Sequence, residues 1–161
     1  MARYEDLEGK VALITGGSGD IGQAAIKELA TQGCRVYFTY NSSKEQADSI
    51  VAEHLDNGKE VVAEQCNIQD KEQVKSLVAS IVEAEGRIDI LVNNAGIYKD
   101  NLFATMTDEE FEDVVQTNLF GTFYCTKAVV DNMYRNRSGA VINISSIAGV
   151  TNSFGQANYS S

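Results

Sequence analysis

The sequence of 161 residues contains no proline and no apolar run long enough to cross a membrane. A membrane-spanning helix needs about 20 predominantly apolar residues in a row, so no such helix is predicted. Residues 1–6 carry acidic side chains and lack the apolar stretch of a secretory leader. We therefore expect a cytoplasmic protein. The absence of proline is unusual at this length and excludes no function.

Cysteine and histidine are also scarce. The three cysteines, Cys34, Cys66 and Cys125, lie far apart and form no C-x-x-C motif. This spacing is not typical of a metal site or a redox pair, so buried and reduced thiols are expected. The single histidine, His54, lies in a polar helical stretch and is expected at the surface. We therefore predict no metal site.

Positive charge is under-represented. The chain has 13 lysines and arginines against 23 aspartates and glutamates, a formal net charge of −10. Broad nucleic-acid binding needs a basic face and is therefore disfavoured. With 43% hydrophobic and 22% charged residues, the composition is that of a globular protein. The length fits one domain spanning residues 1–161.

Short apolar runs alternate with segments that repeat apolar residues every three to four positions. The first pattern indicates strands buried on both faces, and the second indicates amphipathic helices. Their alternation predicts a doubly wound α/β (Rossmann) fold, with a parallel sheet in the order 3-2-1-4-5. The expected strands are 11–14, 36–40, 60–66, 88–92 and 140–144, and the expected helices are 21–30, 44–55, 71–85 and 107–137.

A glycine-rich segment, residues 15–22, joins the first expected strand to the first expected helix. Glycines let the backbone approach a pyrophosphate closely, and the helix N-terminus offers free N–H groups. Gly17, Gly19 and Gly22 fit the general dinucleotide-binding spacing. The alternative is a glycine-rich turn without a ligand. Residues expected at the phosphates are Gly16, Ser18, Asp20, Ile21 and Gly22.

The end of the second expected strand bears on the choice of nicotinamide cofactor. An NAD site places an acidic residue there to bond the ribose hydroxyls. This chain has Tyr40, Asn41 and Ser42, then Lys44, and no acid before Glu45. Hydroxyls, an amide and a lysine suit a 2′-phosphate, so NADP(H) is favoured over NAD(H).

The segment Asn93-Asn94-Ala95-Gly96 follows the fourth expected strand, and the runs 143–149 and 155–159 lie further on. With Asn118 and Gly121, these segments resemble the short-chain dehydrogenase/reductase family over essentially the whole chain. Within that family the sequence is most similar to 3-oxoacyl-[acyl-carrier-protein] reductases.

The resemblance implies NADPH-dependent reduction of a 3-oxoacyl thioester to the 3-hydroxyacyl thioester by hydride transfer, as in fatty acid biosynthesis. It favours a glycine frame that begins at Gly16, with Asp20 in place of the family's middle glycine. Asp20 is able to cap the helix, but its carboxylate repels a diphosphate, so weaker cofactor affinity is expected. The further cofactor-binding residues that the resemblance implies are Asn67, Ile68, Asn94, Ala95, Gly96 and Tyr159.

The resemblance also assigns catalytic residues. Tyr159 matches the tyrosine that protonates the carbonyl oxygen, Ser146 the serine that hydrogen-bonds the same oxygen, and Asn118 the asparagine of the proton relay. The family's lysine, four residues after the tyrosine, would fall two positions beyond Ser161. We therefore expect residues 1–161 to be a C-terminally incomplete domain without its last strands, to be inactive alone, and to expose residues 141–144 as an apolar edge.

Two alternatives remain at this point. One is a non-catalytic dinucleotide-binding or interaction module, and the other is a short-chain reductase of a different ketone or alcohol. For the reductase the expected partner is an acyl-carrier-protein-bound or other acyl thioester, with Lys127, Arg135 and Arg137 as candidate contacts or merely a solvated helix end. The resemblance implies a homo-oligomer, a tetramer in the complete protein, to which apolar residues of the long helical region contribute unless they pack in the core: Phe111, Leu119, Phe120 and Phe123.

Overall fold

The computed structural model describes residues 4–151 and 153–161. Residues 1–3, part of the segment in which no secretory leader was predicted, lie outside the described residues. Its centre is a parallel five-stranded sheet in the order β3-β2-β1-β4-β5, which confirms the predicted order. The strands are β1 (Val11–Ile14), β2 (Arg35–Tyr40), β3 (Val61–Gln65), β4 (Ile90–Asn93) and β5 (Ala140–Asn143).

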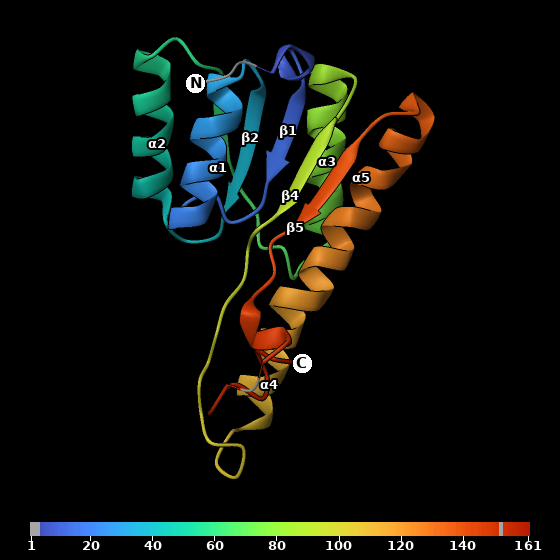
Figure 1. Ribbon diagram of the computed structural model, residues 1–161. Coiled ribbons are helices and arrows are strands. Elements are labelled where there is room, and N and C mark those ends of the chain that lie inside the picture. The colour runs from blue at the N-terminus through green and yellow to red at the C-terminus, as the bar shows by residue number, and fades with distance from the viewer. Residues whose placement is uncertain (1–3, 152) are drawn as a thin grey trace.

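Helices cover both faces of the sheet (Figure 1). One pair of helices lies on one face and another pair on the opposite face, while the 94–107 segment, a further helix and the C-terminal residues extend past the carboxyl ends of the strands (Figure 1). The first pair is α1 (Asp20–Thr31) and α2 (Lys44–Asp56), the second is α3 (Lys71–Glu85) and α5 (Thr122–Asn136), and α4 (Asp108–Val115) lies beyond the strands. Short 3-10 turns, η1 (Glu5–Leu7) and η3 (Ile147–Gly149), complete the fold.

The sheet separates two apolar cores. All four residues of β1 are buried, because a central parallel strand is covered on both faces. Leu13 and Leu91 pack on the side of α3 and α5, whereas Ile14 and Phe38 pack on the side of α1 and α2. The continuous apolar runs of the sequence are therefore explained by burial on both faces of the sheet.

The helical region predicted over 107–137 is interrupted. Between α4 and α5 the chain forms a π-helical turn, η2 (Gln116–Gly121). A capping box between Thr107 and Glu110 starts α4, and Arg137 ends α5 in the left-handed conformation with φ of 50°. The end of this turn packs closely on the loop after β3, since a Cβ atom on Gly121 would lie 2.6 Å from Cδ1 of Ile68.

The cysteines and the histidine differ in how well they were predicted. Cys34, Cys66 and Cys125 are free and buried, as expected. Burial raises the pKa of the Cys66 thiol to about 11 and that of Cys125 to about 12, so both are protonated at neutral pH. The expectation for His54 was wrong: it is buried, because it shares one face of α2 with Ala47 and Ile50.

The surface carries apolar side chains on β5 and on the long helical region. All four residues of β5 are exposed, including Val141 and Ile142, in agreement with the expected apolar edge. Leu119, Phe120 and Phe123 are exposed rather than packed in the core. The homo-oligomer remains a prediction. None of the described helices is long and apolar enough to span a membrane.

Candidate functional site

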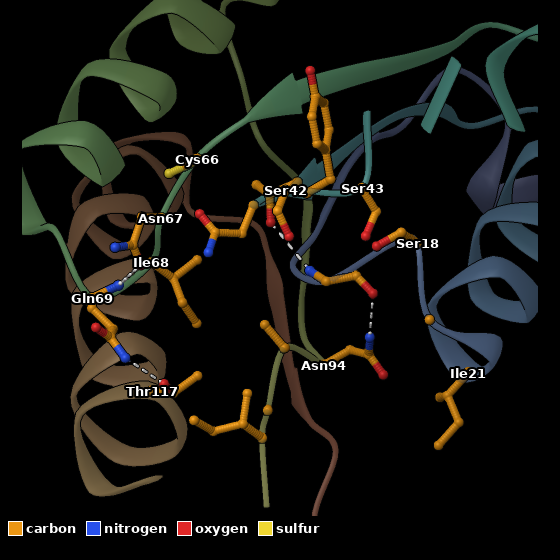
Figure 2. A pocket seen from close by; sticks show the side chains of 18 of the residues that line it. Ser18, Ile21, Ser42, Ser43, Cys66, Asn67, Ile68, Gln69, Asn94 and Thr117 are labelled. Carbon is orange, nitrogen blue, oxygen red and sulfur yellow. Dashed lines mark hydrogen bonds between the residues drawn. The ribbon is translucent and has the colours of Figure 1, made fainter. Parts of the chain in front are cut away.

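A cavity of about 870 Å³ opens at the carboxyl ends of the first four strands. In doubly wound sheets, ligands bind at this edge where the strand order reverses, which here is between β1 and β4. Figure 2 shows Ser18 and Ile21 on one side of the cavity, Asn67 and Thr117 on the other, and Asn94 between them. Twelve of the fourteen predicted cofactor-binding residues line it: Gly16, Ser18, Asp20, Ile21, Tyr40, Asn41, Ser42, Asn67, Ile68, Asn94, Ala95 and Gly96.

The glycines of the loop between β1 and α1 permit close backbone approach. Gly16 has φ of +65°, and a Cβ atom there would lie 2.7 Å from Cα of Ala95. Gly22 does not line the cavity, but its Cβ would lie 2.5 Å from the carbonyl oxygen of Gly16. Both distances are too short for any side chain. The loop is therefore folded tightly onto α1 and the segment after β4.

Hydrogen bonds from neighbouring strands hold this loop. The Thr15 hydroxyl, which is buried, accepts from the backbone N–H groups of Asn94 and Ala95, each at 3.0 Å. The Asn94 side-chain amide donates to the carbonyl oxygens of Thr15 and Gly16, again at 3.0 Å. The Thr39 hydroxyl accepts from Gly16 N–H at 3.1 Å. Sequence analysis named Asn94 but assigned no role to either threonine.

The N-terminus of α1 lies at the edge of the cavity, where Ser18, Asp20 and Ile21 line it. The N-cap of this helix is Gly19, and Asp20 is its first helical residue, so the expectation that Asp20 caps the helix was wrong. A glycine N-cap has no side chain to occupy the first amide groups of the helix. This end of the helix therefore suits an anionic ligand, although the Asp20 carboxylate is close by.

At the end of β2, Tyr40, Asn41, Ser42 and Ser43 line the cavity. Lys44 does not, because its ammonium group pairs with Asp48 one turn along α2, at 2.7 Å. Lys44 was predicted to contribute to a 2′-phosphate site, but its ammonium group lies with Asp48 outside the cavity lining. The hydroxyl and amide groups remain. The acids among the described lining residues are Asp20 and Asp113, and neither follows β2.

The wall opposite the glycine loop contains a polar network that sequence analysis missed. The side-chain amide of Gln69 donates to Oδ1 of Asp113 at 2.8 Å and to Oγ1 of Thr117 at 2.6 Å (Figure 2 shows the Thr117 bond). Lys99 pairs with the other Asp113 oxygen at 2.8 Å. The hydrogen bonds from Lys99 and Gln69 hold the pKa of Asp113 below its ordinary value, despite the opposing effect of burial. No local pattern in the sequence signals these contacts, because the partners are 44 and 48 residues from Gln69.

The three predicted catalytic residues lie outside the cavity lining. The Asn118 side chain, in η2, accepts from Ile97 N–H and donates to Ile97 C=O, both at 2.9 Å. Ser146 precedes η3 and its hydroxyl accepts from Ala148 N–H at 3.2 Å. Tyr159 is half-buried in the C-terminal segment. The structure thus brings the cofactor-type residues together but does not place these three among them.

The C-terminal segment that carries Tyr159 is anchored by its neighbour. Asn158 is buried, and its amide donates to the carbonyl oxygens of Lys99 at 2.8 Å and Glu110 at 3.1 Å. Its own side-chain oxygen accepts from Tyr159 N–H at 2.8 Å. This segment is therefore docked against the 94–107 segment and α4. No group of three potential metal ligands occurs among the described residues.

A family model described as short chain dehydrogenase matches residues 10–161. The chain belongs to the short-chain dehydrogenase family. It is 43% identical over 150 residues to a 3-oxoacyl-[acyl-carrier-protein] reductase FabG of Staphylococcus aureus, an alignment that covers 93% of this chain and 61% of the relative. It is 44% identical over 154 residues to a 3-oxoacyl-[acyl-carrier-protein] reductase of Synechocystis sp., covering 96% of this chain and 62% of the relative.

Among solved structures, the crystal structure of gox2181 is similar to this short-chain dehydrogenase chain with a TM-score of 0.92 and 32% sequence identity. The match covers 97% of this chain and 62% of that one. The chain thus spans about three fifths of the length of the proteins to which it is similar. The short-chain dehydrogenase family is a family of oxidoreductases that use a nicotinamide dinucleotide.

Proposed function

We propose that the cavity binds NADP(H) and that the protein reduces a 3-oxoacyl thioester, carried by acyl carrier protein, to the 3-hydroxyacyl thioester. The observation that carries this proposal is the cradle at Gly16 and Gly22, where any Cβ atom would collide with backbone. A loop packed this closely at a helix N-terminus suits a diphosphate. The 43–44% identity to reductases of Staphylococcus aureus and Synechocystis sp. supports the substrate class.

The proposed cofactor contacts follow the order of the strands. The diphosphate lies on residues 16–22, the 2′-phosphate takes hydrogen bonds from Asn41 and Ser42, and the adenine lies against Asn67 and Ile68. Residues 94–96 face the ribose on the nicotinamide side. When bound, NADPH supplies the hydride for carbonyl reduction. The proton and the hydrogen bonds to the carbonyl oxygen come from side chains of the protein.

The proposed proton transfer uses Tyr159 and Ser146 at the carbonyl oxygen, with Asn118 in the relay that resupplies the proton. Tyr159 gives its phenolic proton to the carbonyl oxygen as the oxygen gains negative charge. Ser146 donates a hydrogen bond to that oxygen. Because its Oγ accepts from Ala148 N–H, its own proton is free for this purpose. Asn118 holds the backbone of Ile97 and so shapes the segment that faces the reacting groups.

A thermal-shift comparison of NADPH and NADH tests the cofactor assignment. A ligand that binds only the folded chain stabilises it by about 2.7 kcal/mol at 100 times its Kd. We expect NADPH to raise Tm by several degrees and NADH at the same concentration to raise it less. A larger shift with NADH would reverse the cofactor preference. No shift with either nucleotide would overturn the proposal.

Replacing Asp20 by asparagine is expected to tighten NADPH binding. The change keeps the side-chain shape and removes a negative charge beside the diphosphate, a repulsion worth on the order of 1 kcal/mol at an exposed site. We expect Kd to fall roughly fivefold at low salt, and the gain to shrink as salt screens the charge. The control is Asp56→Asn on the exposed end of α2. Equal affinities of both variants and the unaltered chain would show that Asp20 does not face the phosphates.

A second function is favoured by the position of the reacting groups. Ser146 and Tyr159 do not line the cavity, and both ends of the Asn118 amide are engaged by Ile97. This arrangement supports a non-catalytic dinucleotide-binding module. If the protein is of this kind, it will bind NADPH but will not oxidise it with a 3-oxoacyl thioester. Oxidation with a different ketone only would instead indicate a reductase of another substrate.

A further inference from the structure

The π-helical turn η2 is held from two sides at successive residues. On one side, Thr117 accepts a hydrogen bond from Gln69 in the loop after β3. On the other, the next residue, Asn118, holds the backbone of Ile97. We infer that Gln69 is a positioning residue that fixes η2. With η2 fixed, the cavity wall at Asn67 and Ile68, the proposed adenine site, forms together with the Asn118–Ile97 contact. This inference rests on the proposed function for its ligand.

Gln69 contacts two segments directly and a third through Asp113. Its amide reaches Asp113 on α4 and Thr117 on η2, and Asp113 in turn pairs with Lys99 after β4. The Thr117 hydroxyl donates to the backbone oxygen of Asp113 at 2.9 Å. Gln69 therefore links the loop that carries Asn67 and Ile68 to the two other segments of this wall.

The network is specific for an amide at position 69. Both amide hydrogens of Gln69 are used, one by a carboxylate and one by a hydroxyl oxygen. The two Asp113 oxygens are divided between Gln69 and Lys99. A carboxylate at position 69 has no hydrogen to donate and would face the Asp113 carboxylate with like charge. The pair Gln69–Asp113 therefore has a fixed direction from donor to acceptor.

This direction allows a reciprocal exchange as a test. Gln69→Glu leaves two facing carboxylates, and Asp113→Asn leaves two facing amides. In the double variant the asparagine donates to the glutamate, and its oxygen still accepts from Lys99. The Thr117 hydroxyl, which accepts from Gln69 in the unaltered chain, can turn to donate to the glutamate, so both contacts of residue 69 are restored. A purely steric role for the Gln69 side chain would not distinguish these variants. Rescue in the double variant is expected only if the hydrogen bond itself positions η2.

The first measurement is hydrogen exchange at the Ile97 amide in the nucleotide-free chain, because that N–H is bonded to Asn118 Oδ1. We expect exchange to be about tenfold faster in Gln69→Glu and to return to within threefold of the unaltered chain in the double variant. The second measurement is the Kd for NADPH, expected to rise about tenfold in Gln69→Glu and to recover in the same way. Gln116→Glu, which adds the same charge at an exposed position of η2, is the control and should change neither.

The two measurements separate the inference from the proposed function. Exchange at Ile97 within twofold of the unaltered chain in Gln69→Glu, or no recovery in the double variant, would overturn the role of Gln69. Failure of the unaltered chain to bind NADPH would overturn the proposed function, while the exchange measurement would still decide whether Gln69 positions Asn118. Slower exchange at Ile97 when NADPH is bound, lost in Gln69→Glu, would support both.

Discussion

Replacing Gly22 by alanine is expected to reduce NADPH affinity at least a hundredfold. The new Cβ would lie 2.5 Å from the carbonyl oxygen of Gly16 and 2.8 Å from Cα of Gly17. Both are backbone atoms, so no side chain can move aside to make room. The loop must therefore shift away from α1, and the approach of its backbone to the diphosphate is lost. Isothermal titration with NADPH measures the change directly.

The effect on folding is expected to be no larger than the effect on binding. Overpacking a tight contact costs about 1–3 kcal/mol, which the cores on both faces of the sheet can absorb. Gly19→Ala is the matched control, because a Cβ there meets only the Gly16 oxygen at an ordinary 3.7 Å. Because Gly19 is the N-cap of α1, where alanine is less favourable than glycine, a small loss of roughly 0.5–1 kcal/mol in the free energy of unfolding is expected, without the steric clash. If Gly22→Ala bound NADPH as tightly as the unaltered chain, the loop would not be the phosphate site.

The sheet was predictable because its signals are local. Each apolar run lies between a turn and a helix, and the alternation of strands and helices restricts the topology to very few possibilities. The order 3-2-1-4-5 was therefore expected and was found. The interruption at η2 was not expected, since the apolar spacing continues through it and its contacts, such as that of Gly121 with Ile68, join residues that are far apart in the sequence. The prediction for His54 was wrong because it relied on the polar residues next to it in the sequence. The helical spacing from Ala47 and Ile50 places His54 on the buried face of α2.

The site divides in the same way. Gly16 and the other glycines were found from a motif whose spacing reflects the turn itself. The polar groups that fix the cavity walls act across the fold. The Thr15 hydroxyl accepts hydrogen bonds from Asn94 and Ala95, which lie 79 and 80 residues away. Gln69 donates to Asp113 and Thr117, which lie 44 and 48 residues away. Such residue types are common in loops and strands, so only their juxtaposition reveals them.

Replacing Thr15 by valine is expected to destabilise the fold by about 2–4 kcal/mol. Valine matches the shape of threonine, so packing at this buried position is preserved. The lost hydroxyl leaves the N–H groups of Asn94 and Ala95 without their acceptor. An unsatisfied buried donor costs about 1–3 kcal/mol, and because Asn94 and Ala95 are half-buried, the lower part of that range applies to each of these two groups. For a chain of this size the change corresponds to a fall in Tm of roughly 4–16 °C, which differential scanning calorimetry measures.

Thr15→Ser separates the hydrogen bonds from the methyl group. Serine keeps the hydroxyl and loses only one buried methyl, so it should cost less than valine, even though valine is the better replacement by shape. The segment 94–96 lines the cavity, so the valine variant should also bind NADPH more weakly, whereas the serine variant should bind it nearly as well as the unaltered chain. If serine proved as destabilising as valine, packing of the methyl group would hold the segment after β4 in place, and the two hydrogen bonds would not.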